Sequence, residues 1–452
     1  GQAFQVRKMM GAEAIDLAGV EVIASRSDVF DGGRTGQETT ISEEQIEVLP
    51  TVSRSIADYA RLNPLAKIDE GGDGLSIEIA GQNNRFNSIY IDGAVNNDAF
   101  GLSGSGTNGG QTGVSPISID AIEQFTVSVA PFDVRQSGFA GGSVSAVTRS
   151  GSNNIEGSAY YFFRNEGLTR KEGFENEDGF NFNDAAPFSA KTYGARLGGP
   201  IIKDKAFFFV SAELQRDETP QPFDIGNYEG NSSLSEINDL ANFVQNEYGY
   251  DIGSFDNNTA FLNSEKILAK LDFNLSSKHK LSVRHSLTVA ENLEARNSGN
   301  RNIIFINGSE YFNSTTNSSA VELNSIFANN TANNLTIGAT FVRDDRDPLG
   351  PDFPTVRLSD GDDETIQFGA ERFSTANLLN QDVITIKNDF NIYKGAHNIL
   401  IGANLEFFKA GNLFIRENFG SYQYFGIGDT SGVDQFGIGM PSSRCDRGFG
   451  QV

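Results

Sequence analysis

The residues that could carry chemistry are few and scattered along the chain. It has three histidines, His279, His285 and His397, and one cysteine, Cys445. These are too few to suggest a histidine or all-cysteine metal site or a disulfide scaffold. No Ser/His/Asp, Cys/His or paired-carboxylate arrangement can be argued from the spacing. We therefore predict no metal, no cofactor and no enzymatic activity.

Two segments have the composition of ligand-binding loops. The glycine-rich run 100–113 (FGLSGSGTNGGQTG) is not followed by Gly-Lys-Ser/Thr and does not open a helix, so it is no phosphate-binding loop. The acidic run 360–364 (DGDDE) is similar to cation-binding loops in composition but lacks the EF-hand register of ligands through position 12. We interpret it as a solvated acidic loop.

Charge and composition exclude several classes of protein. Lys and Arg number 35 against 59 Asp and Glu, which gives a formal net charge of −24. Nucleic acid is therefore not expected as a partner, because phosphate binding needs a basic face. The 49 glycines and 36 phenylalanines beside only 12 prolines argue against collagen, simple disorder and a helical bundle. No run approaches the roughly 20 apolar residues of a transmembrane helix.

The chain beyond residue 150 has the pattern of β-strands with one apolar face. Ile267, Ala269, Leu271 and Phe273 alternate with polar residues, and similar sets recur at 281–289, 335–341, 384–392 and 399–407. Short breaks at 203–205, 276–280, 331–334 and 393–397 alternate with long polar segments at 166–189, 217–263, 290–319 and 343–380. This strict alternation predicts an antiparallel transmembrane β-barrel, with tight turns on one rim and long loops on the other.

The chain before residue 150 is mixed. The segment 40–62 looks helical, with a possible cap at Ser42 followed by Gln45, and short strands are expected at 20–24, 75–80, 88–92 and 125–130. We expect an N-terminal segment at 1–39, a small α/β domain at 40–150 with the glycine-rich loop at its apex, and barrel sequence at 151–452.

The number of strands is small for a barrel that encloses another domain. About nine or ten can be counted, and a barrel must close because open edges in lipid leave unpaired backbone groups. Ten strands cannot easily surround a domain of this size, whereas 22-stranded transporters have plugged lumens. We expect the N-terminal part of a longer protein. A small closed barrel with an external N-terminal domain is the alternative.

Four motifs in order carry a resemblance to a known family. They are Leu49-Pro50-Thr51, IEIAGQNNRFNSIYIDGAVNND at 77–98, AIEQFTVSVAPFDVRQSGFAGGSVSAVTRSG at 121–151, and GGPII at 198–202 with 205–208. The chain resembles TonB-dependent outer-membrane receptors, in particular their SusC/Oar-like branch. The resemblance implies a plug in the lumen of a large, 22-stranded barrel in the outer membrane of a Gram-negative bacterium.

The matching positions in the plug have physical interpretations of their own. Asp92-Gly93 is a turn-forming pair, and Gly141-Gly142 is expected to let backbones approach where the plug meets the wall. Arg85, Arg135 and Arg149 are expected to pair with lumen carboxylates, as similar arginines do in the family; exposed charge is the alternative. The full set of plug-motif residues is Gly81, Arg85, Asp92, Gly93, Gly141, Gly142 and Arg149.

Two further groups of residues are expected to meet partners. The segment 16–24 (DLAGVEVIA), with Asp16, Leu17, Val20 and Val22, sits where the family carries its coupling box, and a β-prone stretch can add to a sheet edge. It is equally interpreted as the first plug strand. Asn97, Asp98 and Asn108 flank or lie in the glycine-rich loop and are expected to face substrate, unless that loop is only a mobile connection.

The resemblance implies an active importer. A TonB-type periplasmic coupling protein would supply the energy, outer-membrane lipids would surround the barrel, and a surface lipoprotein is a possible partner. The extracellular substrate would be a large or scarce nutrient, whether a glycan, a peptide or a metal chelate. The alternatives are an outer-membrane adhesin or secretion-associated barrel with the plug as a gate, and a soluble β-rich carbohydrate-binding protein.

Overall fold

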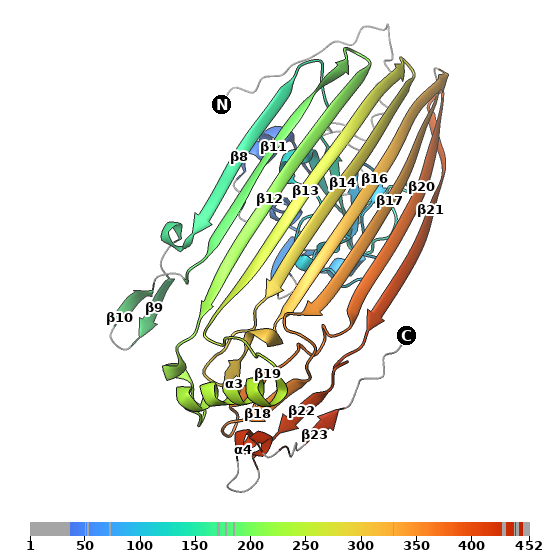
Figure 1. Cartoon of the computed structure of the whole chain (residues 1–452). Coiled ribbons are helices and arrows are strands. Elements are labelled where there is room, and N and C mark those ends of the chain that lie inside the picture. The colour runs from blue at the N-terminus through green and yellow to red at the C-terminus, as the bar shows by residue number, and fades with distance from the viewer. Residues whose placement is uncertain are drawn as a thin grey trace.

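The dominant element of the protein is one antiparallel sheet of nine strands, here called the wall (Figure 1). The computed structural model describes residues 37–445 apart from 50, 52–53, 72–73, 170–171, 177–178, 184–185, 329, 427–430, 438 and 440–442. The order in the wall is β21-β20-β17-β16-β14-β13-β12-β11-β8. The strands are β8 (Glu156–Asn165), β11 (Ser189–Ile202), β12 (Ala206–Pro222), β13 (Asn257–Ser276), β14 (His279–Glu294), β16 (Glu310–Ala328), β17 (Thr331–Pro348), β20 (Asn377–Lys394) and β21 (His397–Phe414).

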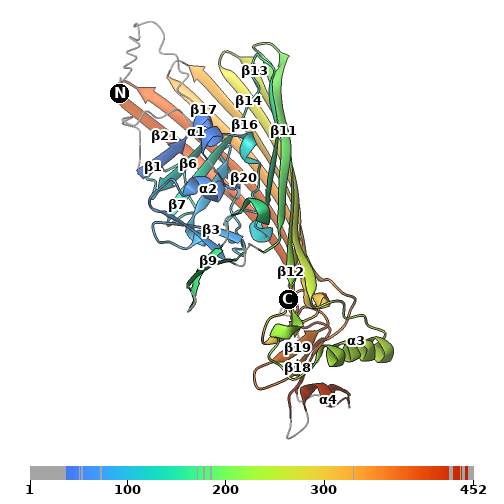
Figure 2. The ribbon, with the colours of Figure 1, turned by 90° about the vertical axis from the view of Figure 1, so that its left-hand side faces the viewer.

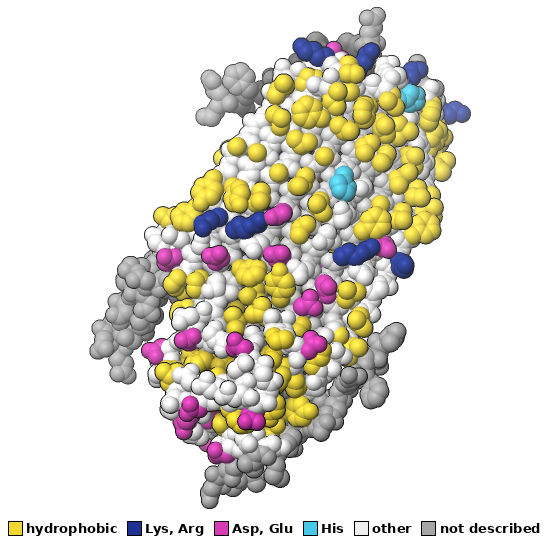
Figure 3. Space-filling view, in the orientation of Figure 1, with side chains coloured by type: hydrophobic (Ala, Val, Ile, Leu, Met, Phe, Trp, Pro, Cys, Tyr) yellow, Lys and Arg dark blue, Asp and Glu magenta, His cyan; other side chains and the backbone are white. Residues whose placement is uncertain are grey.

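The wall has an apolar outer face because its side chains alternate with period two. On β13, Ile267 and Leu271 are exposed on the outer face, whereas Lys266 and Lys270 are buried on the inner face. Apolar side chains form a broad band over the half of the outer face that carries the short turns (Figure 3). This is the pattern of a sheet with lipid on one side.

Charged residues end the apolar band on the side of the long loops. Arg216 pairs with Glu265 at 2.6 Å, and Arg343 pairs with Asp382 at 2.7 Å. Beyond this row the outer face becomes acidic (Figure 3). The 20 residues of β13 extend about 65 Å, whereas an apolar band is about 25 Å tall. The strands therefore continue well beyond the membrane.

The observed strands correct some of the predicted breaks. The short break expected at 331–334 lies within β17, and the chain turns between Ala328 and Thr331 instead. The long connection expected at 217–263 begins only after Pro222 and ends at Asn257. Outside the membrane a strand needs no apolar face, so backbone pairing continues where the apolar alternation has stopped.

The plug packs on the inner face of the wall (Figure 2). Its five-stranded sheet has the order β1-β6-β7-β4-β5. Phe125 and Val127 of the plug share one buried cluster with Phe209 and Leu268 of the wall. The elements are β1 (Gln37–Ile41), α1 (Glu43–Val48), α2 (Ile56–Ala60), β4 (Ser88–Ile91), β5 (Ala94–Val95), β6 (Ile122–Val129) and β7 (Gly142–Thr148).

The single helix expected at 40–62 is instead a strand end and two short helices. Helix α1 begins with the predicted capping box between Ser42 and Gln45. It ends at Leu49, whose backbone is extended (ψ 126°). Pro50 follows, and a proline disfavours the helical conformation in the residue before it.

The long connections fold together into a compact subdomain, here called the cap (Figure 1). Its five-stranded sheet has the order β15-β19-β18-β22-β23, with parallel pairing of β15 with β19 and of β18 with β22. Ile237, Phe305, Leu358 and Phe368 lie in its buried core. The elements are α3 (Leu234–Tyr248), β15 (Asn302–Ile304), β18 (Thr355–Ser359), β19 (Thr365–Phe368), β22 (Ser421–Tyr424), α4 (Gly432–Gly437) and β23 (Ser443–Cys445).

The remaining elements are small. Among the described residues, no helix has the length and apolar character needed to cross a membrane. Two hairpins and six 3-10 helices complete the described part of the chain: β2 (Ala66–Gly71) with β3 (Gly74–Ile79), β9 (Glu172–Asn176) with β10 (Gly179–Asn183), and η1 (Asn84–Phe86), η2 (Gly110–Thr112), η3 (Ile119–Ala121), η4 (Glu166–Leu168), η5 (Ile225–Asn227) and η6 (Ile306–Gly308).

Candidate functional site at the plug–wall interface

Asp92 and Gly93 form a two-residue turn between β4 and β5, and its tip touches the wall. Both have positive φ, 49° and 74°, and Ile91 pairs with Ala94 across the turn. This is the type I′ geometry for which Asp-Gly is favoured. Thr148, at the end of β7, donates to Asp92 from its backbone at 2.8 Å and from its hydroxyl at 2.7 Å.

Two wall cations face the Asp92 carboxylate. Arg284 Nε lies 3.1 Å from it and Lys270 Nζ lies 4.0 Å away. Burial would raise the pKa of Asp92, but Lys270, Arg284 and the bonds from Thr148 together hold that pKa below its ordinary value. Lys270 also donates to the Thr148 carbonyl at 3.0 Å. The turn is therefore anchored to β13 and β14 as an ionised carboxylate.

A second charged cluster joins the plug to β12 and β13. Glu213 is buried on β12 and accepts from Lys266 Nζ at 2.9 Å. Arg54 of the plug lies 3.7 Å from Glu213 and also pairs with Asp120. Ser118 of the plug donates to Glu213 at 2.9 Å. The Tyr160 hydroxyl of β8 also donates to Glu213 at 2.7 Å, so one wall carboxylate holds four groups, two of which belong to the plug.

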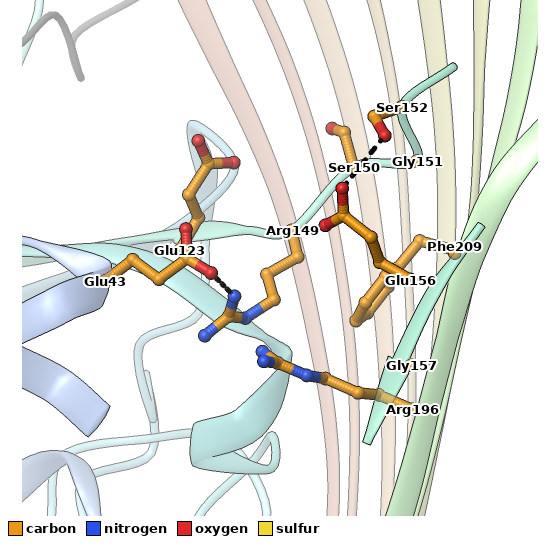
Figure 4. A pocket seen from close by; sticks show the side chains of 11 residues that line it. Glu43, Glu123, Arg149, Ser150, Gly151, Ser152, Glu156, Gly157, Arg196 and Phe209 are labelled. Atoms are coloured by element: carbon orange, nitrogen blue, oxygen red, sulfur yellow. Dashed lines mark hydrogen bonds and ion pairs between the residues drawn. The ribbon is translucent and has the colours of Figure 1, made fainter. Parts of the chain in front are cut away.

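A third cluster lies nearer the short-turn end, around a cavity of about 350 Å³ between the plug and the wall. Arg149 pairs with Glu43 and with Glu47 (3.3 Å), both on α1, and Glu47 also accepts from Arg196 of β11 at 3.0 Å. Figure 4 shows the two guanidinium groups side by side, with Glu156 on the far side of the cavity. Helix α1 follows the N-terminal segment 1–39 closely in the sequence.

The glycine-rich loop rests on the loop-end half of the wall. Gln111 donates to Asp344 of β17 at 2.7 Å, and Gln381 of β20 donates to Asp98 at 3.1 Å. Gly109 has a φ of 68°, and a Cβ there would collide with the Thr316 hydroxyl of β16. The loop is thus fitted to the wall by its backbone as well as by side chains.

The residues of the plug motif have different surroundings in the structure. Gly81 has a φ of 72° in an open turn. Gly141 and Gly142 do permit close approach, but to Ile79, Asn87 and Ser128 within the plug. Their expected position against the wall is therefore wrong, because β7 is covered there by other plug strands.

The three arginines also differ from expectation. Arg149 meets carboxylates of α1 and not of the wall. Arg135 pairs with Asp133 of its own loop at 2.6 Å, which lowers the pKa of Asp133 below its ordinary value against the effect of burial. Arg85 has no ion pair within the described part of the chain, and its side chain lies beside Gly101. Neither Arg85 nor Arg135 forms an ion pair with a described wall residue, although Asp389 of β20 helps to raise the pKa of Arg135.

Of the three residues expected to face substrate, two make hydrogen bonds within the protein and the third is buried. Asn97 bonds Ile89 and Ser88 inside the plug, Asp98 bonds Ser103 and Gln381, and Asn108 is buried. Asp16, Leu17, Val20 and Val22 lie outside the described residues. The acidic run is not wholly solvated either, because Asp360 is buried and accepts from Tyr228 and Ser232.

The wall residues that hold the plug were missed in the sequence. Glu213, Lys266, Lys270 and Arg284 occupy the polar face of otherwise apolar strands. Ionisable residues at membrane depth are a functional signal in themselves, and this signal was available from the alternation. Their plug partners were not, because those contacts join residues more than 50 positions apart. No group of side chains suited to hold a metal is found among the described residues.

Charged and polar contacts thus hold the plug to the inner face of the wall, and comparison with known proteins identifies both parts. Residues 34–144 match the family model described as the TonB-dependent Receptor Plug Domain. Residues 147–225 and 235–450 match the model described as an outer membrane beta barrel domain. The chain belongs to the TonB-dependent outer-membrane receptors. The predicted family, fold class and location in a Gram-negative outer membrane are thereby confirmed.

Individual relatives of this receptor are much longer. The TonB-dependent transporter Oar of Myxococcus xanthus is 29% identical over 205 residues, which cover 43% of this chain and 18% of Oar. The outer membrane transporter YddB of Escherichia coli superimposes with a TM-score of 0.59 at 14% identity, covering 86% of this chain and 50% of YddB. The siderophore receptor PirA of Acinetobacter baumannii gives 0.54 at 16% identity, covering 82% and 48%. The receptor chain thus spans about a fifth of Oar and about half of these two structures.

Proposed function

We propose that this receptor imports a large or scarce nutrient across the outer membrane, driven by a TonB-type periplasmic coupling protein. The observation that carries the proposal is the plug held to the inner face of the wall by three charged clusters. Cargo cannot pass such an interface unless part of it is released.

Release by thermal motion alone would be rare. Removing one partner of a buried ion pair costs about 3–5 kcal/mol. Two such pairs, at Asp92 and Glu213, would keep a fully released plug below about one molecule in 10⁴. An external source of work is therefore needed, and the segment 16–24 is where we place its attachment. Strand addition of Val20 and Val22 to the coupling protein would transmit the pull towards α1.

The other partners follow from the same proposal. Lipids surround the apolar band, and an extracellular glycan, peptide or metal chelate is the cargo. The excess of acidic residues outside the membrane disfavours polyanionic cargo. A surface lipoprotein remains a possible partner at the loop end.

The test compares two strains of the source bacterium, one lacking the gene and one with an in-frame deletion of residues 16–24. An energised importer predicts that both strains grow equally poorly on the same nutrients in a panel of sole carbon and iron sources. Surface amounts of the protein are measured as the control. Normal growth of the 16–24 deletion strain beside a defect of the gene deletion would contradict active import and favour an adhesin or secretion-associated barrel.

A further inference from the structure

Along one cross-strand row of the wall, strands β12 and β13 present different side chains to the plug from those of β14 to β17. One cross-strand row runs Glu213, Lys266, Thr288, Thr316 and Val342 from β12 to β17. It changes from charged to hydroxyl side chains at β14. Because cross-strand neighbours lie about 5 Å apart, this change occurs within one strand spacing.

A neighbouring cross-strand row carries no charged residue. It runs Ser211, Leu268, Ser286, Ser318 and Thr340, again from β12 to β17. Ser286, Ser318 and Thr340 are buried, and their hydroxyls bond within the wall, as in Thr340 to Ser318 at 3.2 Å. The patch formed by Ser314, Thr316 and Ser318 of β16 and Thr340 of β17 is here called the hydroxyl patch.

Among the described residues, the plug meets the hydroxyl patch and its surroundings without an ion pair, by close packing and by hydrogen bonds such as that from Gln111 to Asp344 at 2.7 Å. A Cβ at Gly338 of β17 would lie 3.0 Å from the Ala94 Cβ, and Gly109 abuts Thr316. Thr288 donates to the Pro116 carbonyl at 2.9 Å. The ion pairs that join the plug to the described wall are all on β11 to β14. The plug is therefore held by ion pairs on one side, and by hydrogen bonds and packing on the other.

Two buried carboxamides in the plug lie near this second side. Asn96 is two residues from Ala94, which packs against Gly338 of β17, and Asn108 precedes Gly109, which abuts Thr316 of β16. The backbone N–H of Asn108 donates to the backbone carbonyl of Asn96 at 3.1 Å, which places the two residues together. Both are about 1–2% exposed, and none of their four side-chain amide atoms has a hydrogen-bond partner among the described residues. Such groups cost about 1–3 kcal/mol each if they stay unpaired.

We propose that the route for cargo opens between the plug and the hydroxyl patch, while the plug stays attached to β11–β14. Ser and Thr hydroxyls and the Asn96 and Asn108 amides then bind cargo through neutral hydrogen bonds. That chemistry suits an uncharged glycan, because its hydroxyls both donate and accept and no charge has to be paired. This inference rests on the proposed function, since it concerns where an energised plug moves.

The test uses two matched cysteine variants of the full-length protein in cells, in a Cys445→Ser background. Ser318→Cys reports on the hydroxyl patch and Ser211→Cys on the attached side. The two serines lie in one cross-strand row and are 7% and 5% exposed. A membrane-impermeant biotin–maleimide is added to intact cells with and without a protonophore. We expect labelling of Ser318→Cys to be several-fold faster in energised cells, and labelling of Ser211→Cys to stay slow in both.

The outcomes distinguish failure of the proposed cargo route from failure of energised import. Equal or faster labelling of Ser211→Cys on energisation shows that import is energised but overturns the proposed route. No response at either cysteine also overturns the route, and the 16–24 deletion strain then shows separately whether import is energised. For the cargo class, neutral oligosaccharides are expected to slow labelling of Ser318→Cys at least twofold, and polygalacturonate fragments are not. Protection by the polyanion alone, or by neither, overturns the glycan assignment.

Discussion

At the scale of single residues, Asp92 both forms a turn and carries a negative charge, and substitutions can test each role separately. Asn tolerates positive φ as Asp does, so Asp92→Asn keeps the turn but leaves Lys270 and Arg284 without a counter-charge. We expect the plug to lose about 3–5 kcal/mol of its attachment. Hydrogen–deuterium exchange of β7 in detergent would be faster in the variant.

The control for this prediction is Gly93→Ala, which strains the turn at a φ of 74° but keeps the carboxylate. Its cost is expected to be about 1 kcal/mol. Equal exchange in the two variants would show that the turn, and not the charge, holds the plug.

The same residue predicts a pH dependence. The pKa of Asp92 is lowered in the folded protein, so its contribution is complete above the unfolded pKa of about 4 and is lost as pH falls towards the folded pKa. Cleavage of the plug by pepsin in detergent should therefore accelerate only below about pH 4. The Asp92→Asn variant should lack that step. Loosening of the wild-type plug between pH 7 and 5 would contradict the assignment.

At the scale of elements, the glycine-rich loop is predicted to depend on its fit to the wall. Gly109→Ala adds both backbone strain and a collision with Thr316. Gly81→Ala is the matched control, because its φ of 72° gives the same strain but no atom lies within 4 Å of the added Cβ. We expect faster amide exchange over 103–113 in Gly109→Ala alone. The same change in Gly81→Ala would contradict a specific contact with the wall.

The sequence predicted these elements unevenly, for physical reasons. The membrane part of each strand was readable because lipid on one face and plug on the other impose strict alternation, as at Ile267 and Leu271. The strand ends were not, because residues such as Asp345 and Asp347 continue the ladder in water. The Asp92-Gly93 turn was readable from local preference, whereas its partners Lys270 and Arg284 depend on register between distant strands.

At the scale of the whole molecule, the cap should depend on Asp360. This carboxylate accepts from the Tyr228 hydroxyl at 2.9 Å and the Ser232 hydroxyl at 2.7 Å, and so joins two distant connections. Burial and the neighbouring Asp360 raise the pKa of Tyr228. Asp360→Asn is expected to cost about 1–3 kcal/mol and to expose the segment before α3 to protease added to intact cells. The exposed Asp362→Asn is the control, and equal cleavage of both variants would contradict the role of Asp360.

The cap also marks the limit of what could be predicted. Its loops were expected to be long, polar and acidic, but not to share a core. The parallel pairs β15–β19 and β18–β22 join segments about 60 residues apart, and local patterns do not encode such pairs. The fold class was predictable because lipid constrains every strand in the same way, and no such common constraint acts on the cap.

In the proposed function, a coupling protein drives this receptor by binding its N-terminal segment. The most direct measurement is retention of the full-length receptor, in detergent, on the immobilised periplasmic C-terminal domain of the coupling protein. Wild type and Val20→Ile should be retained, whereas Val20→Pro should not, because proline removes the N–H that strand addition needs. Retention of Val20→Pro equal to wild type would contradict strand addition at this site, and no retention of any form would contradict an energised importer.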